Sequence, residues 1–339
     1  MQLDTLKTAL SRVEKAVGDD PPFSRVRCRG REIIARDRTI SATYSMTDDL
    51  GCDVLIDYAT AVAAVKRMPP DSDVTYDQDG DRLIIRSGRT RAAIVRAPED
   101  VDDIVAISSR TNGQSSIVGR DAYELAAAIV SLLRYQGPAD ATPQWLSALI
   151  QVGDDLMVIG DGSKIIAWTP DRWLTRANVT DVLIPRRFSE QLDSTDDPPS
   201  MILVSDTTIS AIWEGSASFC TTFMAGSAPA SVAALIRNWR EPVWPVQDEF
   251  RTAAQLVSDL TVGDVTITNK TMSGMSRTGS MTTKSIVDVP DSTSVVVPQA
   301  SLSVIAKTAD RWQVDADNPS PFVAGVVRGL VCTRVHTDG

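Results

Sequence analysis

Three short apolar runs, each ending in Asp or Pro directly before a helical pattern, are the feature that most constrains how this chain of 339 residues folds. They are 54–57 (Val-Leu-Ile-Asp), 182–185 (Val-Leu-Ile-Pro) and 295–298 (Val-Val-Val-Pro). β-Branched residues favour a strand, and a closing Asp or Pro favours the start of a helix by capping or presetting its first turn. The runs end 128 and 113 residues apart, counted from 57 to 185 to 298. That spacing is the size of a small domain, so the sequence indicates three related modules.

A short and a long helix are expected in each module. The short helices follow the apolar runs at 58–68, 186–192 and 299–309. The long helix opens each module, because apolar residues recur there at helical spacing. Its apolar faces are expected to comprise Leu3, Leu6, Leu10, Val13 and Val17; Tyr123, Leu125, Ile129, Leu132 and Leu133; and Phe250, Ala253, Ala254, Val257 and Leu260.

Alternating strands follow the short helices, so the fold class is α+β, with two helices on an antiparallel sheet in each module. Turn formers and prolines place the modules at 1–113, 114–241 and 242–339. A Ser/Gly-rich stretch at 273–280 is expected to be a loop. The strands are expected at 74–77, 82–86 and 90–95, at 201–205, 208–213 and 218–224, and at 312–315, 322–328 and 330–335.

The residue types in the sequence argue against a catalytic site. The single histidine, His336, lies in the C-terminal tail, which argues against a histidine-based nucleophilic triad and excludes a multi-histidine metal site. The four cysteines are far apart without a C-x-x-C pair, so neither zinc nor a disulfide framework is indicated. The run 77–81 lacks the Gly and Glu of a calcium loop and is expected to be a hairpin turn, and 160–164 lacks phosphate-loop spacing. A mechanism based on Lys or carboxylate groups, and with it an enzyme of an unrecognised type, stays open as an alternative. Because the sequence has no paired acid-base or phosphate motif, we expect no catalytic residue, metal or cofactor, and no enzyme.

Charge and hydropathy limit the partners. No apolar run approaches the roughly 18 residues that span a bilayer, and the first residues do not form a basic-then-apolar leader, so we expect a soluble cytoplasmic protein without membrane contact. The formal net charge of −10 argues against a generally basic surface for nucleic acid. Any contact with nucleic acid must depend on where Lys and Arg are placed.

Several stretches resemble one known family, the sliding clamps of bacteria and their phages, which are the β subunits of DNA polymerase III. Residues 82–91 resemble the hairpin near the end of the clamp's first domain, and residues 98–100 and Ile104 resemble that domain's exit. Residues 145–146 and 156–167 resemble the family's second domain with its T-D-G-H-R-L strand turn, and 184–186 resembles its V-P-R run. The likeness covers most of the first two modules, and the third matches mainly by position and pattern.

The resemblance implies a DNA sliding clamp, a processivity factor in DNA replication. Two chains of three clamp modules would form a homodimeric ring around duplex DNA, with helices lining the pore and sheets forming the outer wall. The ring would tether the replicative DNA polymerase, the clamp loader and other clients through short peptide motifs. The alternative is a phage structural or assembly protein of repeated β modules that does not encircle DNA. That alternative explains the repeats and the acidity but not the basic residues on the module helices.

A clamp holds DNA of any sequence, so it needs Lys and Arg that face phosphates and no base contacts. The alternative interpretation of any single one of these side chains is an ordinary charged residue on the solvent-exposed face of a helix. The DNA-facing set expected on the module helices is Lys7, Arg12, Lys15, Lys66, Arg67, Arg120, Arg134, Arg186, Arg187, Arg251 and Lys307.

The resemblance also implies an apolar client-peptide cleft between the second and third modules. The family's His-Arg pair is Ser163-Lys164 here. The planar guanidinium of the family's Arg is therefore replaced by the ammonium group of Lys, which acts as a point charge. A plain β-turn is the alternative interpretation for Asp161-Gly162. The cleft residues are expected to be Leu146, Gly160, Gly162, Ser163, Lys164, Ile165, Pro242, Val243, Val331, Cys332, Thr333, Arg334 and Val335.

A head-to-tail dimer interface is implied by family position. Ala92 and Ile94 on the last strand of the first module would meet Leu256 and Val257 on the opening helix of the partner's third module. An edge strand left unpaired invites aggregation, which favours such a contact.

Overall fold

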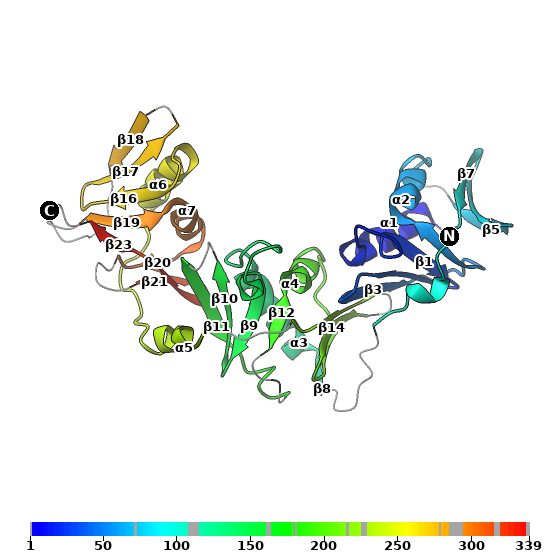
Figure 1. The fold of residues 1–339 in the computed structure, drawn as a ribbon, viewed down its shortest axis with the longest axis horizontal. Helices are drawn as coiled ribbons and strands as arrows, with labels where there is room; N and C mark the ends of the chain where they lie inside the picture. Colours follow the sequence, from blue (N-terminus) through cyan, green and yellow to red (C-terminus); the bar gives the residue numbers. More distant parts are fainter. Residues whose placement is uncertain are drawn as a thin grey trace. The chain divides into compact units, whose positions relative to one another are not determined.

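The chain divides into two compact units, which are described one at a time. The first comprises Met1–Ala126 and Glu190–Phe223, and the second comprises Ala127–Ser189 and Met224–Gly339. The chain passes between them within helices α3 (Arg120–Leu133) and α4 (Arg186–Asp193) and again after residue 223 (Figure 1). The computed structural model describes residues 2–70, 73–107, 115–160, 164–177, 179, 182–214, 217–224, 229–277, 279–284, 294–314 and 319–336. No helix in these ranges is long and apolar enough to cross a bilayer.

An eight-stranded antiparallel sheet is the centre of the first unit. Its strands are β1 (Arg25–Arg29), β2 (Glu32–Arg36), β3 (Ile40–Ser45), β4 (Asp53–Asp57), β8 (Ser115–Val118), β13 (Met201–Val204), β14 (Thr208–Trp213) and β15 (Ala217–Thr222). They lie in the order β4-β1-β2-β3-β15-β14-β13-β8. The two halves join where β3 pairs with β15, with Ala42 opposite Phe219. One sheet thus combines strands from the first and second predicted modules.

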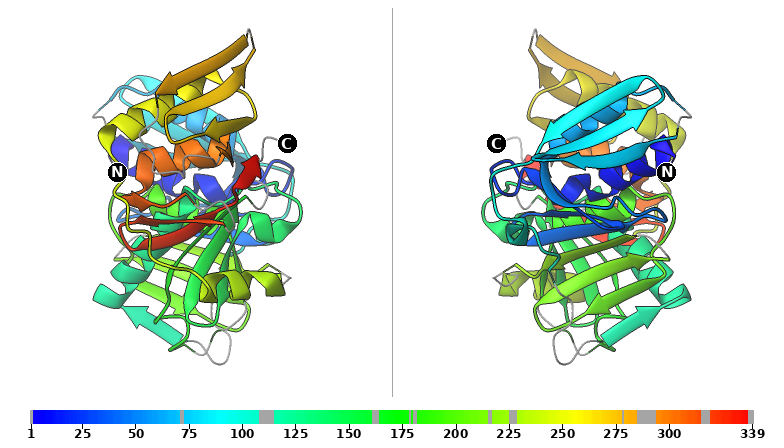
Figure 2. Two further views of the ribbon diagram at one scale, coloured as in Figure 1. Left: turned by 90° about the vertical axis from the view of Figure 1, so that its left-hand side faces the viewer. Right: turned by 90° about the vertical axis from the view of Figure 1, so that its right-hand side faces the viewer.

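Helices α1 (Leu3–Val13) and α2 (Tyr58–Lys66) pack together, and α1 lies on β2 and β3. The apolar face of α1 is buried, as its spacing predicts. A separate three-stranded sheet of β5 (Thr75–Asp79), β6 (Arg82–Ser87) and β7 (Thr90–Val95) lies beside α2 (Figure 2). The turn between β5 and β6 contains Gly80 at φ +60°, which confirms the hairpin predicted for this acidic run.

The second unit contains a seven-stranded antiparallel sheet. Its strands are β9 (Ala148–Val152), β10 (Asp155–Gly160), β11 (Ile165–Pro170), β12 (Leu183–Pro185), β20 (Arg311–Trp312), β21 (Ser320–Ala324) and β22 (Val327–Val331), in the order β12-β9-β10-β11-β22-β21-β20. This sheet too combines two predicted modules, because β11 of the second pairs with β22 of the third.

A five-stranded sheet completes the second unit. It runs in the order β18-β17-β16-β19-β23, formed by β16 (Asp264–Ile267), β17 (Thr271–Ser276), β18 (Gly279–Lys284), β19 (Ser294–Pro298) and β23 (Arg334–His336). Helices α6 (Asp248–Leu260) and α7 (Gln299–Thr308) pack against each other and against this sheet (Figure 2). A shorter helix, α5 (Ala230–Arg237), precedes α6.

The three apolar runs are strands β4, β12 and β19, and each leads directly into a helix, as predicted. The first residue of each following helix, α2, α4 or α7, donates a side-chain hydrogen bond to carbonyls at the end of the preceding long helix or just beyond it. These bonds join Tyr58 to Leu10 (3.4 Å), Arg186 to Gln136 and Gly137 (2.7 and 2.9 Å), and Gln299 to Ser258. Carbonyls in the last turn of a helix lack partners within the helix, and Tyr58 and Gln299 supply partners for two of them. Arg186 instead binds carbonyls of the segment that follows α3.

Four sequence predictions about these elements are wrong. The strands predicted at 322–328 and 330–335 have other bounds, because β21 and β22 form a hairpin that turns at Gly325 and Val326, and β23 begins only at Arg334. Residues 273–280 are not a loop, because β17 and β18 pair there as a hairpin. Tyr123 is 55% exposed, because it stands two positions from Leu125 and so on the opposite side of α3. Leu260 is 53% exposed at the last residue of α6.

Candidate functional site

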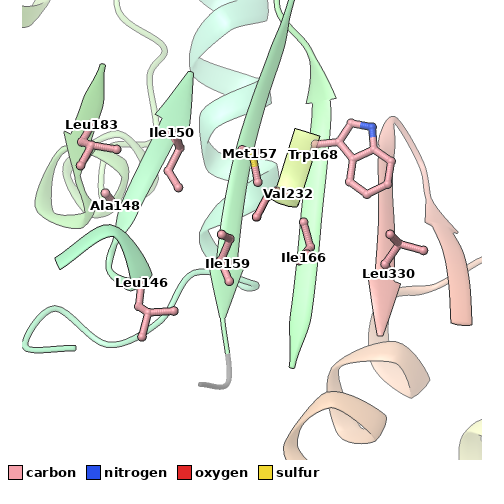
Figure 3. Packing of buried hydrophobic residues seen from close by; sticks show 10 residues of the cluster. All are labelled: Leu146, Ala148, Ile150, Met157, Ile159, Ile166, Trp168, Leu183, Val232 and Leu330. Carbon is pink, nitrogen blue, oxygen red and sulfur yellow. The ribbon is translucent and has the colours of Figure 1, made fainter. Parts of the chain in front are cut away.

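Buried apolar side chains cover one face of the seven-stranded sheet, and the predicted cleft residue Leu146 is among them (Figure 3). Leu146 lies in a 3-10 turn (Gln144–Leu146) before β9 and is 9% exposed. Val232 of α5 and Leu330 of β22 belong to the same cluster. Helix α5 therefore covers part of this face.

Strand pairing brings five predicted cleft residues together. Gly160 ends β10 and lies opposite Ile165 at the start of β11. Ile165 in turn lies opposite Val331 of β22. The backbone N–H of Cys332 donates to the carbonyl of Lys164 at 2.7 Å. Residues distant in sequence thus form one contiguous group where β10 and β22 end and β11 begins.

Two glycines fix the backbone beside this group. A Cβ at Gly160 would lie 2.0 Å from the carbonyl oxygen of Tyr135, and one at Gly137 would lie 2.4 Å from that of Leu146. The N–H of Gly137 donates to this Leu146 oxygen at 3.0 Å. The segment after α3 is therefore held against the strands at a distance that no larger residue permits.

The remaining cleft residues are spread over other elements. Pro242 is buried, and its neighbour Val243 is 67% exposed, in the segment between α5 and α6. Thr333 follows β22 and accepts a hydrogen bond from Ser320 at 3.2 Å.

Two cleft residues belong to another sheet. Arg334 and Val335 are in β23, which pairs with β19 of the five-stranded sheet. Gly162 and Ser163 lie outside the described residues. A peptide-binding role for each cleft residue stays a prediction.

Cys332 is an exposed cysteine within the predicted cleft. Partial burial raises the pKa of its thiol, and the nearby Arg334 acts in the opposite direction. A raised pKa disfavours the reactive thiolate. Within the described ranges, no group of His, Cys, Asp or Glu side chains gathers closely enough to hold a metal ion.

Trp239 is a feature that the sequence analysis missed. Its ring meets Trp168 edge-on with centroids 5.9 Å apart, and the guanidinium of Arg328 lies 5.3 Å from its centroid. Its Nε1 donates to the carbonyl of Gly329 at 3.2 Å. The sequence signal that could have found it is the pair of tryptophans at 239 and 244, which are two of the seven in the chain and lie beside the predicted module boundary.

The predicted DNA-facing cations differ in how available they are. Lys7 pairs with Asp4 at 3.2 Å, and Arg120 pairs with Glu124 at 2.8 Å. Such surface pairs are weak and leave the cation accessible. Arg12 and Arg187 are half-buried, and Lys15, Lys66, Arg67, Arg134 and Lys307 are exposed.

Arg186 and Arg251 have structural contacts of their own. The Nη1 of Arg186 binds the carbonyls that follow α3, as described above. Arg251 donates from Nη1 to Ala306 at 2.8 Å and from Nη2 to Ala309 at 2.6 Å, at the end of α7. These bonds hold each guanidinium against a helix end, so a DNA-facing role for the two arginines stays a prediction.

Two of the four predicted interface residues are buried within their own unit. Ile94 is 2% exposed and Val257 is fully buried, whereas Leu256 is 45% exposed. Ala92 is half-buried, and Val95, at the end of β7, is 57% exposed. Leu256 and Val95 are therefore two exposed apolar side chains on these elements that a second chain could reach.

The fold was compared with known proteins. No protein-family model matches the sequence, and no curated protein matches it. Among solved structures, the Caulobacter crescentus pol III beta matches with a TM-score of 0.76 and 16% identity over 98% of both chains. The Pseudomonas aeruginosa DNA polymerase sliding clamp matches with a TM-score of 0.73 and 14% identity, also over 98% of both.

A further match is the Helicobacter pylori beta clamp bound to a DNA ligase peptide, with a TM-score of 0.72 and 14% identity over 97% of each chain. The TM-scores establish the fold, and coverage of 97–98% means that the whole chain shares it. At identities of 14–16%, the likeness shows the fold alone. The chain therefore has the fold of the bacterial DNA polymerase III β sliding clamps.

Proposed function

We propose that this protein is a DNA sliding clamp, a non-enzymatic subunit of a ring that encircles duplex DNA in the cytoplasm and tethers replication proteins to it. The observation that carries the proposal is the likeness to sliding clamps over 98% of the chain. The repeated strand-to-helix unit with its cross-helix hydrogen bond supports three modules per chain, at 1–113, 114–241 and 242–339. Two such chains, joined head to tail, complete the ring.

The ring holds DNA by topology more than by charge. The exposed cations on the module helices are few, and the formal net charge of the chain is −10. Phosphate contacts by a few cations are weak and fall off steeply with salt. A closed ring cannot leave a circular duplex at any salt concentration, whereas it slides off a linear end.

Clients bind through short peptides at the group formed by Gly160, Lys164, Ile165, Val331 and Cys332. Main-chain groups at strand ends and apolar side chains are what a short peptide anchor requires. The Helicobacter pylori neighbour was solved with a DNA ligase peptide, which supports peptide clients for this fold. A DNA polymerase and a clamp loader are the clients expected here.

The test is retention on circular DNA. Protein loaded onto nicked circular DNA by its loader is expected to remain bound through gel filtration in 1 M salt, and a single restriction cut is expected to release it. Lys66→Ala with Arg67→Ala is expected to reduce the rate of loading more than retention, because charge orients DNA before the ring closes. Lys270→Ala with Arg277→Ala, which removes two cations from the β17–β18 region, is the matched control and should load normally. Equal loss from circular and linear DNA would disprove ring closure.

A further inference from the structure

The segment at residues 97–107, here called the strap, crosses one face of the eight-stranded sheet after β7 ends. The N–H of Ala97 donates to the carbonyl of Leu55 on β4 at 2.7 Å, and the N–H of Ile107 donates to Oγ of Ser41 on β3 at 2.8 Å. Strands β1 and β2 lie between β4 and β3 in the sheet, so the strap spans four neighbouring strands. Neither the DNA-facing set nor the predicted client cleft includes a residue of the strap.

An apolar contact holds the middle of the strap on the sheet. Ile104 is fully buried and packs in one cluster with Ile34 of β2 and Leu55 of β4. Val101 and Ala106 of the strap pack against the same cluster. Burial of apolar side chains is favourable but not directional. The apolar contact therefore keeps the strap on the sheet without fixing the geometry of its polar groups.

Arg27 of β1 binds the sheet more closely than it binds the strap. Its Nε and Nη2 bind the two carboxylate oxygens of Asp53 on β4 at 2.7 and 2.8 Å. Its Nη1 contacts the strap and donates to the carbonyl of Val101 at 3.0 Å and to Asp102 at 3.3 Å. A buried cation without a partner is strongly unfavourable, but Arg27 would keep its carboxylate on β4 if the strap left. Departure of the strap therefore leaves no uncompensated charge at this position.

Arg25 repeats this arrangement two residues earlier on β1. It pairs with Asp57 at the end of β4, and its Nε lies 3.7 Å from Oε2 of Glu99 in the strap. Both of these atoms are buried without a hydrogen-bond partner among the described residues, and so is Nε of Arg36, whose Nη1 donates to the carbonyl of Val105 at 3.4 Å. Such atoms have lost water without gaining a partner, which is unfavourable. Opening of the strap would return them to water.

We propose that the strap is a latch that opens as a unit while the sheet stays folded, and that rising salt concentration favours its opening. The closed state is held by the apolar contact and by ion pairs with Glu99 and Asp102, and the open state keeps both arginines paired with β4. Dissolved ions screen the pairs to the strap, because the Asp102 side chain is 79% exposed. The open latch uncovers Ile34 and Leu55. Salt concentration thus controls whether this apolar face of the first unit is exposed.

Hydrogen exchange followed by mass spectrometry on the full-length chain tests the latch. Amides of the strap are expected to exchange at least about 10-fold faster than those of β1, β2 and β4, because the opening is local. Raising KCl from about 0.05 M to about 0.5 M is expected to speed exchange of the strap about 3- to 10-fold and to leave the strands unchanged. Exchange of strap and strands at one rate would show that the strap does not open by itself, and would overturn the proposal.

A charge variant tests the ion pairs. Glu99→Gln with Asp102→Asn is expected to exchange in low salt about as fast as the wild type does in high salt, and to lose most of the salt dependence. Asp103→Asn is the matched control, because Asp103 is an exposed acid of the same turn for which the described residues contain no ion pair. It should behave like the wild type. Rates are compared after division by the intrinsic exchange rate of each sequence.

Ile104→Val tests the apolar contact separately. It removes one buried methyl group and no charge, so it is expected to speed exchange of the strap about 2- to 10-fold at each salt concentration while keeping the wild-type salt dependence. Wild-type salt dependence in the charge variant, or wild-type exchange in Ile104→Val, would contradict the latch. These measurements need neither DNA nor a closed ring, so their outcome is independent of the circular-DNA experiment.

Discussion

Arg27 is a nearly buried cation that ties the first unit together. Its side chain is 6% exposed, and its Nε and Nη2 bind the two carboxylate oxygens of Asp53 at 2.7 and 2.8 Å. Its Nη1 also donates to the carbonyl of Val101 at 3.0 Å. Strand β1 is thereby joined to β4 and to the segment that leaves the first predicted module. The hydrogen bond to Asp53 raises the pKa of Arg27, and the same bond lowers the pKa of Asp53.

Asp53→Asn is expected to lower the free energy of unfolding of the first unit by about 1–3 kcal/mol at pH 7, because a buried guanidinium loses the carboxylate that binds it through two oxygens and keeps only the longer contact with Asp102. Asp53 has a folded-state pKa below its unfolded value, so its contribution is present above the unfolded pKa of about 4 and is lost as the pH falls through the folded value. The difference between the variant and the wild type should therefore shrink below about pH 4. Urea unfolding from pH 7 to pH 3 measures it.

The control is Asp81→Asn, at an exposed pair in which Asp81 lies 3.7 Å from Arg82. Exposed pairs of this kind contribute little, so a change within about 0.5 kcal/mol is expected. A loss at Asp53 no larger than this control would show that the Arg27 network does not stabilise the unit.

Helix pairing in the second unit depends on Arg251, which extends from α6 to the carbonyls at the end of α7. Arg251→Met keeps most of the apolar stem but removes both hydrogen bonds, and we expect a loss of about 1–3 kcal/mol in the free energy of unfolding. Lys307→Met, at an exposed position on α7, is the control and should change stability by less than about 0.5 kcal/mol. The measurement is thermal and urea unfolding. If both variants are equally stable, the hydrogen bonds of Arg251 do not stabilise the pairing of α6 with α7.

At the level of elements, local patterns were sufficient for the strand-to-helix units. The runs before α2, α4 and α7 are rich in β-branched residues and end in a helix-starting Asp or Pro, so both elements are found within a few residues of their predicted bounds. The β17–β18 hairpin was missed because Ser, Thr and Gly have weak strand preference, and pairing with β16 overrides it. Strands β1 to β3 were not singled out, and the sheets shared between predicted modules have no local signal at all.

In the candidate site, too, some residues could be placed together from the sequence and others could not. Gly160, Lys164 and Ile165 are contiguous in a recognisable turn, so the sequence could place them together. Val331 was assigned to the cleft by family position, and the pairing between β11 and β22 places it opposite Ile165. A pocket beside α5 could not be predicted, because its lining residues Arg237 and Pro321 are far apart in sequence and are brought to one place only by the tertiary packing of α5 on the sheet.

At the scale of the whole molecule, the proposed ring requires a second chain. Leu256→Asp is expected to convert the dimer to a monomer in light scattering, because it places a charge on an exposed apolar residue of α6. Val95→Asp on β7 should do the same, and Val95 is a better test residue than Ile94 because Ile94 is buried in its own unit.

Val326→Asp is the matched control for the dimer. Val326 is 66% exposed at the turn between β21 and β22, so this variant adds the same charge away from the proposed interface. Its mass should equal that of the wild type. A wild-type mass for both interface variants would place the contact elsewhere.

The pairing of β3 with β15 also affects how the chain is made. Thr39 and Thr221 meet at this seam, 182 residues apart. At a synthesis rate of about 5–20 residues per second, β3 waits roughly 10–40 s on the ribosome before its partner strand emerges. During that time it presents an open strand edge, the kind of surface that pairs with other nascent chains. Translation of the middle of the message is therefore the step at which this protein depends most on chaperones and on low local concentration.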